Sequence, residues 1–474
     1  MFFRKAVTVI GATSMFLFFC ISAFGADVPS NAELLKELRE MRKIIKKQDE
    51  RIAVLEKQLQ EQSKAVEEQQ SASDARKREM DLLHGKVAET QKALAVREAA
   101  PADARKEELD RLRGVAEAFE GLIINAGITA VGQGTPDANN AGGGEDSRFD
   151  GSYSVDVELE KQFDDYGLAF IHLEAGQGDT IEGDLAVFSN VNRDAGDSNA
   201  HVDVTEAWYE HFLFDRQVII TGGKLDASGF IDTNEYANDE CSQFLGRMFR
   251  NSDAIDWPDD NALGGRIMLA PEMLKAFELD AVYMDEDGDW EEIFNKPFAG
   301  VQLNFMPARA FDYDEDMWGG NYRVYFWYNG ADHTKWKDAE KTKETNCGVG
   351  LSCDQMLTEV FGLFGRFGWQ NPEVSVLEYH WSVGGQMTGQ YWNRERDVVA
   401  VAVGQAIPGK EYGDAGNPHD NETHLEAYYA YKVNDHLTLS PDMQFIWDPN
   451  GVGNSADGDN DCIFVYGVRG QVDF

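Results

Sequence analysis

The spacing of hydrophobic positions changes once along the chain and divides it into two parts. From Leu34 onward, apolar residues recur every seven positions on two interleaved sites, while Lys, Arg and Glu fill the outside. No Gly or Pro interrupts residues 31–84. Heptads sustained over this length favour a coiled coil over residues 31–98 rather than a lone amphipathic helix, and they leave its strand number open. The core positions are Leu34, Leu38, Met41, Ile45, Gln48, Ile52, Leu55, Leu59, Gln62, Val66 and Gln69.

A second helical stretch, EELDRLRGVAEAFEG, comes after Pro101 and predicts a helical linker over residues 99–121. The helical spacing then stops, and polar and apolar residues alternate with a period of two, which is the pattern of a β-strand with two different faces. In residues 152–163 one face is apolar and the other carries Ser, Asp and Glu. The same alternation recurs in residues 361–370, 425–432, 437–447 and 462–474.

The connections between the alternating segments also follow a pattern. Short turns such as FDDYG, FDRQ and VNDH alternate with long polar stretches such as GTPDANNAGGGEDSRFDG and NSADGDND. A half-buried strand of a soluble sandwich would give the same alternation. Short turns opposite long loops, with aromatic residues near strand ends, favour an outer-membrane barrel instead. We therefore predict an all-β transmembrane antiparallel β-barrel of about 16 strands over residues 122–474, preceded by the α-helical coiled coil.

The first residues have the composition of an export signal. Arg4 and Lys5 precede an apolar run over residues 6–19, and Ala23 and Gly25 occupy the −3 and −1 positions of a cleavage site. This pattern predicts a signal peptide over residues 1–25. Phe19 stands before Cys20, where lipoprotein processing requires a small side chain, so we do not expect a lipid anchor. No later window has the length of a transmembrane helix, so a membrane role would require a barrel or a peripheral contact.

The net charge of −41 is unevenly distributed. Residues 1–113 hold 21 basic and 19 acidic side chains, whereas residues 114–474 hold 22 basic and 65 acidic ones. An acidic part of this kind is a poor nucleic-acid binder, since phosphate contacts need Lys and Arg. A channel lined by Glu and Asp, with long acidic loops, accommodates the charge without a charged core.

Four cysteines follow the predicted cleavage site. Cys347 and Cys353 lie six residues apart in CGVGLSC. In an oxidising compartment a local disulfide between them is the expectation, and the alternative is two unpaired small hydrophobic residues.

Several stretches together resemble the carbohydrate-selective porin family, the OprB-like porins. They are GLFGRFGWQ (362–370), NRERDVVAVAVG (393–404), ETHLEAYYAYKVNDHLTLSPDMQFIWDPNG (422–451) and the terminal strand, with a further block at residues 221–246. The resemblance implies an outer-membrane porin that passively conducts small hydrophilic solutes, carbohydrates in particular. The long coiled coil and the acidic balance depart from the family pattern and leave the sugar itself open. The residues at the family positions are Gly223, Lys224, Asp226, Asn234, Phe244, Arg366, Arg394, Asp397, Glu422, Glu426, Pro441, Asp442, Gln444 and Pro449.

Porins do no covalent chemistry, so their functional residues are the polar side chains that line the pore. Each candidate is either a generic lumen residue or a residue of the constriction. Arg394 and Asp397 are expected to form an inward ion pair at a strand mouth, the alternative being an exposed loop pair. The pore-lining candidates are Lys224, Asp226, Arg366, Arg394, Asp397, Glu426, Asp442, Gln444 and Arg469.

No motif supports an enzyme, a cofactor or a metal site. HWSVG (380–384) lacks the first Gly of a nucleophile elbow, and there is no HExxH, Walker loop or zinc-spaced Cys pair. The Asp-rich stretches at residues 285–292 and 456–461 do not match EF-hand spacing and predict solvated turns.

The expected partners follow from this assignment. They are outer-membrane lipid, small solutes such as sugars, a homotrimer of this chain, and the cell wall through a periplasmic coiled coil. The terminal aromatic residue Phe474 resembles the signal read by the barrel assembly machinery. Two alternatives stay open: a general or ion-selective porin, either cation-preferring or phosphate-type, and a structural tether between outer membrane and cell wall with the barrel as anchor.

Overall fold

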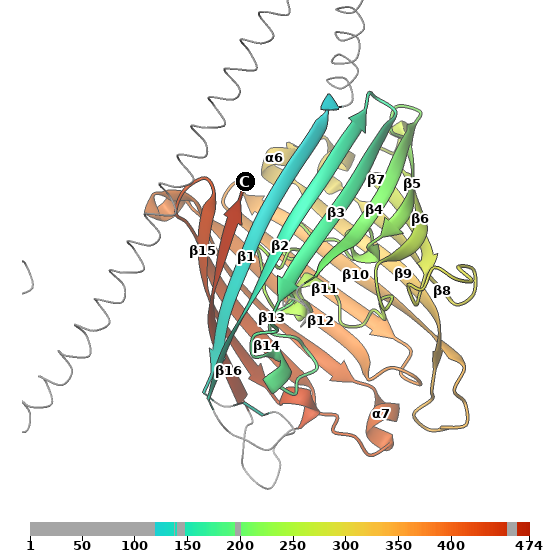
Figure 1. Ribbon diagram of the computed structural model, residues 1–474, viewed down its shortest axis with the longest axis vertical. Helices are drawn as coiled ribbons and strands as arrows, with labels where there is room; N and C mark the ends of the chain where they lie inside the picture. The colour runs from blue at the N-terminus through green and yellow to red at the C-terminus, as the bar shows by residue number, and fades with distance from the viewer. Residues whose placement is uncertain (1–118, 137, 140–146, 195–200, 453–461) are drawn as a thin grey trace, which may run out of the picture. The chain divides into compact units, whose positions relative to one another are not determined.

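The computed structural model describes residues 119–136, 138–139, 147–194, 201–452 and 462–474, which belong to a unit beginning at Ala116. The predicted signal peptide, the predicted coiled coil and nearly all of the predicted linker lie outside these residues. Within them, sixteen antiparallel strands form one closed barrel (Figure 1). The predicted barrel and its strand number are confirmed. None of the helices that the structure describes is long and apolar enough to cross a membrane.

The strands follow one another around the barrel in chain order. Their bounds are β1 Leu122–Thr135, β2 Arg148–Phe163, β3 Gly167–Gln177, β4 Val202–Leu213, β5 Val218–Leu225, β6 Ala262–Leu269, β7 Phe277–Asp285, β8 Pro297–Phe305, β9 Gly320–His333, β10 Glu344–Thr358, β11 Phe361–Gln370, β12 Leu377–Gly389, β13 Arg394–Pro408, β14 Glu422–Lys432, β15 Leu437–Trp447 and β16 Cys462–Asp473.

Short helical turns occupy the connections. The α-helices are α4 Arg247–Arg250, α5 Pro307–Phe311, α6 Glu315–Trp318 and α7 Lys410–Asp414, and the 3₁₀ turns are η2 Glu182–Asp184, η3 Ala227–Gly229, η4 Glu272–Leu274, η5 Gln390–Trp392 and η6 Pro449–Gly451.

The barrel closes where its first and last strands meet. β1 pairs with β16 in antiparallel register from Gly127 opposite Asp473 to Gly134 opposite Tyr466. The amide of Phe474 adds a hydrogen bond of 2.9 Å to the carbonyl of Ala126. Closure leaves no unpaired sheet edge, which a strand protein needs in hydrocarbon. The start of β1 and the end of β16 therefore lie at the same end of the barrel (Figure 1).

The two-residue alternation separates an inner from an outer face, as predicted. Along β14, Glu422, His424 and Glu426 are buried inside, whereas Tyr431 on the other face is 41% exposed. Outward apolar residues such as Val401 are also exposed. Apolar side chains cover the outside because that surface meets lipid, and polar ones face the interior.

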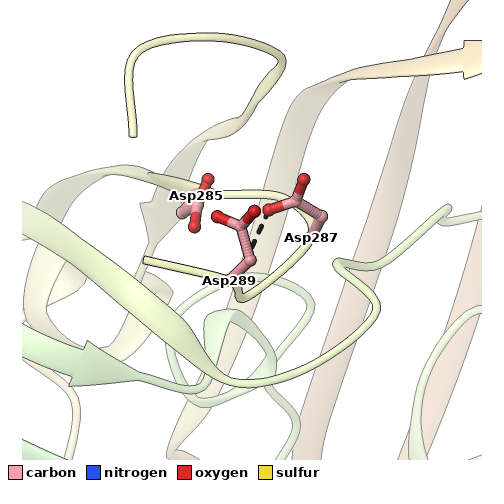
Figure 2. A group of neighbouring side chains, drawn as sticks. All are labelled: Asp285, Asp287 and Asp289. Carbon is pink, nitrogen blue, oxygen red and sulfur yellow. Dashed lines mark hydrogen bonds between the residues drawn. The ribbon is translucent and has the colours of Figure 1, made fainter. Parts of the chain in front are cut away.

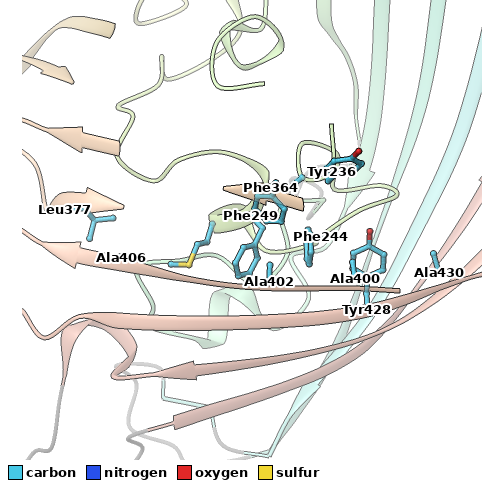
Figure 3. Packing of buried hydrophobic residues seen from close by; sticks show 12 residues of the cluster. Tyr236, Phe244, Phe249, Phe364, Leu377, Ala400, Ala402, Ala406, Tyr428 and Ala430 are labelled. Carbon is cyan, nitrogen blue, oxygen red and sulfur yellow. The ribbon is translucent and has the colours of Figure 1, made fainter. Parts of the chain in front are cut away.

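Much of the interior is filled by two connections that fold back into it. We call residues 178–194, after β3, the first inner loop, and residues 226–261, between β5 and β6, the second inner loop. Phe244 of the second inner loop packs against Phe249 at 5.3 Å, Phe364 of β11 at 5.8 Å and Tyr428 of β14 at 5.1 Å between ring centroids (Figure 3). The small inward side chains of β13, including Ala400, leave room for these rings.

Two further apolar clusters fix the remaining parts of the loops. Ile231 of the second inner loop packs with Phe298 of β8 and Trp327 of β9. Ile181 of the first inner loop packs with Ile446 of β15. Because apolar contacts join each loop to the inner wall, the barrel contains a packed partition rather than a wide empty lumen.

Candidate solute pathway

Arg366 of β11 points into the barrel, and its guanidinium donates to several groups of the second inner loop. Its side chain is fully buried, and its Nε donates to the Asp232 carboxylate at 3.2 Å. Its two terminal nitrogens donate to the carbonyls of Phe249 at 2.5 Å and Ala237 at 2.6 Å. A guanidinium has five donors in a fixed plane, which suits it to holding several acceptors of one loop at once.

Two more inward charges hold the same loop. Arg469 of β16, 1% exposed, donates to the carbonyls of Glu240 at 2.6 Å and Gln243 at 2.8 Å. The Glu426 carboxylate, 0% exposed, accepts from the amides of Leu245 at 2.7 Å and Gly246 at 2.9 Å. A Cβ on Gly246 would lie 2.8 Å from that carboxylate, so glycine permits this approach without a shift of the Glu426 side chain.

The first inner loop is held in a similar way. The Glu422 carboxylate accepts from the amides of Phe188 and Ser189 at 2.8 and 2.7 Å. Gln444 of β15 donates to the Val191 carbonyl and to the Asp442 carboxylate, each at 2.9 Å. The inward residues of β11 and β14–β16 therefore act as loop anchors. Arg366, Glu426, Asp442 and Gln444 are absent from the lining of the cavity described below, as is Arg469.

Three other pore-lining candidates do not face the lumen. Lys224 lies opposite Ala207 on β4 and Leu263 on β6, and in the strand register these positions belong to the outer face of the barrel. The prediction that Lys224 lines the pore is therefore wrong. Lys224 faces outward because the buried, inward residues of β5 include Thr221 and Leu225, and Lys224 lies on the opposite face of the strand.

Arg394 and Asp397 do form the expected ion pair, at 2.8 Å, but not in the pore. Asp397 also accepts from the hydroxyl of Tyr429, an outward residue of β14, and Arg394 lies 4.1 Å over the ring of Tyr431. The pair belongs to an aromatic cluster on the outer face, so its assignment to the lumen is corrected.

Cys347 and Cys353 are both free thiols on β10. Six residues of strand separate their Cα atoms by about 20 Å, whereas a disulfide requires less than about 7 Å. The expected disulfide is therefore wrong, because the segment is a strand and not a loop.

One open space in the barrel is a cavity of about 730 Å³ that is lined by residues of β1–β4, β16 and the two inner loops. Asp226, among the predicted candidates, lines it and caps η3 through a 2.8 Å bond from the Ser228 amide. The rest of the lining was not identified from the sequence. The polar faces of β2–β4 were the available signal, but alternation alone does not reveal which inward residues the loops leave uncovered. The carboxylates in the lining are Asp156, Glu158, Glu174, Asp194, Glu206, Asp226, Asp239, Glu240 and Asp473, and the cations are Arg193 and Arg250, with His172.

The cavity wall on β2–β4 is an ordered hydrogen-bonding surface. His172 Nε2 lies 3.0 Å from an oxygen of Asp156, and its Nδ1 lies 2.9 Å from the Thr205 hydroxyl. Beside them, the ring of Phe170 stacks on Trp208 with centroids 4.9 Å apart. The wall thus combines carboxylates with one aromatic face, a pairing that can contact both the hydroxyls and the apolar faces of a sugar.

Opposite this wall, the second inner loop carries most of its charge in internal pairs. Arg250 forms an ion pair with Glu240 and lies 3.9 Å from an Asp226 oxygen. It also donates to Ser228 at 3.2 Å and Asn251 at 2.6 Å. Its donors are therefore engaged by the loop, so Arg250 offsets little of the acidity of the facing wall.

Asp194 of the first inner loop is the most unusual group in the lining. It is 8% exposed, and one of its oxygens accepts from Ser154 at 2.9 Å and from the Cys241 thiol at 3.5 Å. Its other oxygen has no hydrogen-bond partner among the described residues. Burial raises the pKa of Asp194 to about 7, against the opposing hydrogen bond from Ser154.

A separate acidic group lies outside the cavity. Asp285, the last residue of β7, and Asp287 and Asp289 in the connection after it bring one oxygen each within 4.8 Å of one another (Figure 2). The Trp290 amide donates to Asp285 at 3.2 Å and the Glu291 amide to Asp289 at 2.7 Å. These bonds close a local turn, in which Asp287 and Asp289 are exposed, as expected from the sequence, whereas Asp285 is buried.

A closed barrel with an apolar exterior and a polar cavity defines an outer-membrane porin, a channel rather than an enzyme. The family model described as carbohydrate-selective porin, OprB family, matches residues 148–474. The chain belongs to this family, as the sequence motifs predicted.

The chain is similar in fold to a solved porin and in sequence to a bacterial relative. The structure of Pseudomonas putida OprB at high pH has a TM-score of 0.63 at 16% identity, covering 76% of this chain and 96% of that one. At this identity the similarity concerns the fold. An uncharacterized protein of Aquifex aeolicus (strain VF5) is 28% identical over 229 residues, 48% of this chain and 59% of the relative. The match thus spans less than two thirds of that relative's length.

Proposed function

We propose that the protein lets small hydrophilic solutes, carbohydrates in particular, diffuse passively through the acidic cavity between β1–β4 and the inner loops. The observation that carries this proposal is a cavity of about 730 Å³ whose lining is mostly hydrogen-bonding side chains, with Phe170 as an aromatic surface. Hydroxylated solutes exchange bonds with water for bonds with such a lining, so they pass without tight binding.

Liposome swelling tests this proposal. Purified full-length protein should admit glucose and a disaccharide at rates that fall with solute size, because the inner loops narrow the barrel. The matched control is liposomes without protein. Swelling no faster than the control with every monosaccharide would refute sugar diffusion.

A second candidate is an ion-selective porin that prefers cations. It is favoured by nine carboxylates in the lining against two arginines. Carboxylate rings attract cations and repel anions. In planar bilayers under a KCl gradient we expect a reversal potential of the sign that potassium selectivity requires. The opposite sign would favour the phosphate-type alternative.

We also propose an envelope arrangement for the whole chain. Residues 1–25 direct export, residues 31–98 form a coiled coil in the periplasm, and the chain assembles as a homotrimer. Cross-linking in native membranes should give a trimer, and deletion of residues 31–113 should abolish it if the coil drives assembly. Unchanged conductance with a loosened envelope would instead favour the tether.

A further inference from the structure

The wall of the cavity carries more acceptors than its own residues use. Glu174 of β3 lines the cavity and has no hydrogen-bond or ion-pair partner within the described ranges. Glu206 of β4 accepts from the indole of Trp208 at 3.0 Å. Of the two arginines in the lining, Arg250 is engaged by Glu240 and its loop neighbours. The excess acidity is therefore directed at the open space.

Asp194 supplies an independent sign that a donor belongs there. It is more than nine-tenths buried, lines the cavity and keeps one oxygen without a partner among the described residues. A buried carboxylate oxygen without a donor costs free energy, and native structures rarely keep one. A solute that brings a positively charged N–H donor into the cavity would offset the negative charge of this carboxylate.

The spacing of the acids favours a polyatomic cation over a bare metal ion. Among the described residues, the only three metal-ligating side chains within 4.8 Å of one another are Asp285, Asp287 and Asp289, which lie outside the cavity. A metal ion such as Ca²⁺ needs six to eight oxygen ligands at about 2.4 Å. The cavity acids are too dispersed to provide that shell, but dispersed acceptors suit a solute with several donors.

The aromatic surface narrows the class of solute further. The ring of Phe170 lines the cavity and is supported from behind by Trp208. An aromatic face attracts an ammonium group and also covers the apolar face of a sugar ring. Carboxylates and a ring on one wall thus recognise a solute that carries both features.

We propose that the cavity holds a subsite for small amine-bearing solutes, with Asp194 and Glu174 binding the ammonium group and Phe170 covering the carbon skeleton. This inference rests on the proposed function, since it names a solute class for the same diffusion pathway. The site binds weakly enough for release because its acceptors are few and its solute stays partly hydrated.

The test compares glucosamine with glucose, which share a ring and differ in one amine. Full-length protein in planar bilayers is placed under a gradient of glucosamine hydrochloride, and the reversal potential gives the permeability of glucosamine relative to chloride. Glucose swelling of liposomes with the same protein measures the neutral pathway. We expect glucosamine to be preferred over chloride, and Glu174→Gln and Asp194→Asn each to lower that ratio about tenfold, as expected for one charge-assisted hydrogen bond.

The matched control is Glu291→Gln, which removes the same charge from an exposed turn outside the cavity and should leave the ratio unchanged. A wild-type ratio near one, or ratios in both cavity variants equal to the control, would overturn the subsite while glucose swelling upholds the porin. Block of the current by submillimolar Ca²⁺ that glucosamine cannot relieve would replace the subsite with a metal site. Absence of glucose swelling would remove the proposed function and the subsite together.

Discussion

The strongest perturbation of the pathway should be the loss of Arg366, which lies outside the cavity lining. Substitution by Met keeps the aliphatic length of the side chain and removes its donors. Asp232 then stays buried without its partner, and the carbonyls of Ala237 and Phe249 lose their bonds. We expect the second inner loop to detach from β11 and the pore to widen, while the barrel strands stay paired.

The free energy that the docked loop loses in this variant can be worked out from the burial of the Arg366–Asp232 ion pair. Both side chains are 0% exposed, and removal of one partner of a buried ion pair costs about 3–5 kcal/mol. Each abandoned carbonyl adds about 1 kcal/mol. Even about 3 kcal/mol changes the ratio of docked to released loop roughly a hundredfold. The apolar contacts of Phe244 and Ile231 oppose full release, so we expect a fluctuating loop and not an empty barrel.

Single-channel conductance, trisaccharide swelling and limited chymotrypsin digestion measure this effect. Arg366→Met should raise conductance, admit the trisaccharide and expose cleavage sites in residues 226–261, without changing the heat-modifiable mobility of the barrel. The double variant Asp232→Asn, Arg366→Met should destabilise the docked loop less than Arg366→Met alone, because no charge then remains buried without a partner. The control is Arg396→Met, whose ion pair with Asp435 is exposed. Wild-type conductance and protease resistance in Arg366→Met would refute the anchoring argument.

Three further predictions concern other groups. Asp194, faced by Asp156, Glu240 and Cys241, has a pKa of about 7, so its charge appears as pH rises and cation selectivity should increase between pH 6 and 8. Asp194→Asn should remove that step from the reversal potential, and a step that persists would assign it elsewhere. Phe474→Ser should reduce the amount of barrel in the outer membrane on immunoblots before it alters single-channel conductance, and normal insertion would contradict its assembly role. Maleimide labelling of unfolded, unreduced protein should modify Cys347 and Cys353, and labelling only after reduction would contradict the free thiols.

The sequence was sufficient to predict the barrel because a strand with one face in lipid requires side chains that alternate with a period of two. Polar or small residues occupy many inward positions and apolar residues occupy most outward ones, so the alternation around Glu426 or Arg469 predicted which way the residue points. Strand number followed from length and turn spacing. The same logic failed at Lys224 and at Asp397, where one residue of offset at a strand end exchanges the two faces.

The candidate pathway was less predictable because it depends on contacts between distant segments. The sequence marks Arg366 as inward, but whether it meets solute or residues 226–261 depends on where that loop packs. The loop is positioned by Ile231, which packs with Phe298, and by Phe244, which packs with Phe364, in each case a residue more than 60 positions further along the chain. No local period encodes such long-range packing. The disulfide between Cys347 and Cys353 failed for a related reason, since close spacing in sequence means proximity only in a turn.

Most of the residues that carry the family resemblance differ from those that line the cavity proposed for solute passage. The family positions Arg366, Glu422 and Glu426 are buried and hold the inner loops, and they determine where the open space lies. Much of the charge of that space comes from Glu174, Asp194 and Glu206, which lie outside the motifs that carry the resemblance, whereas Asp226 belongs both to those motifs and to the lining. A porin can keep the residues that anchor the inner loops and still change the cavity wall, because substitutions on β2–β4 alter the lining without releasing a loop. An exchange of the wall acids for neutral amides should accordingly change which solutes pass while the barrel and its partition persist, whereas an exchange of the anchors should change the size limit for every solute alike.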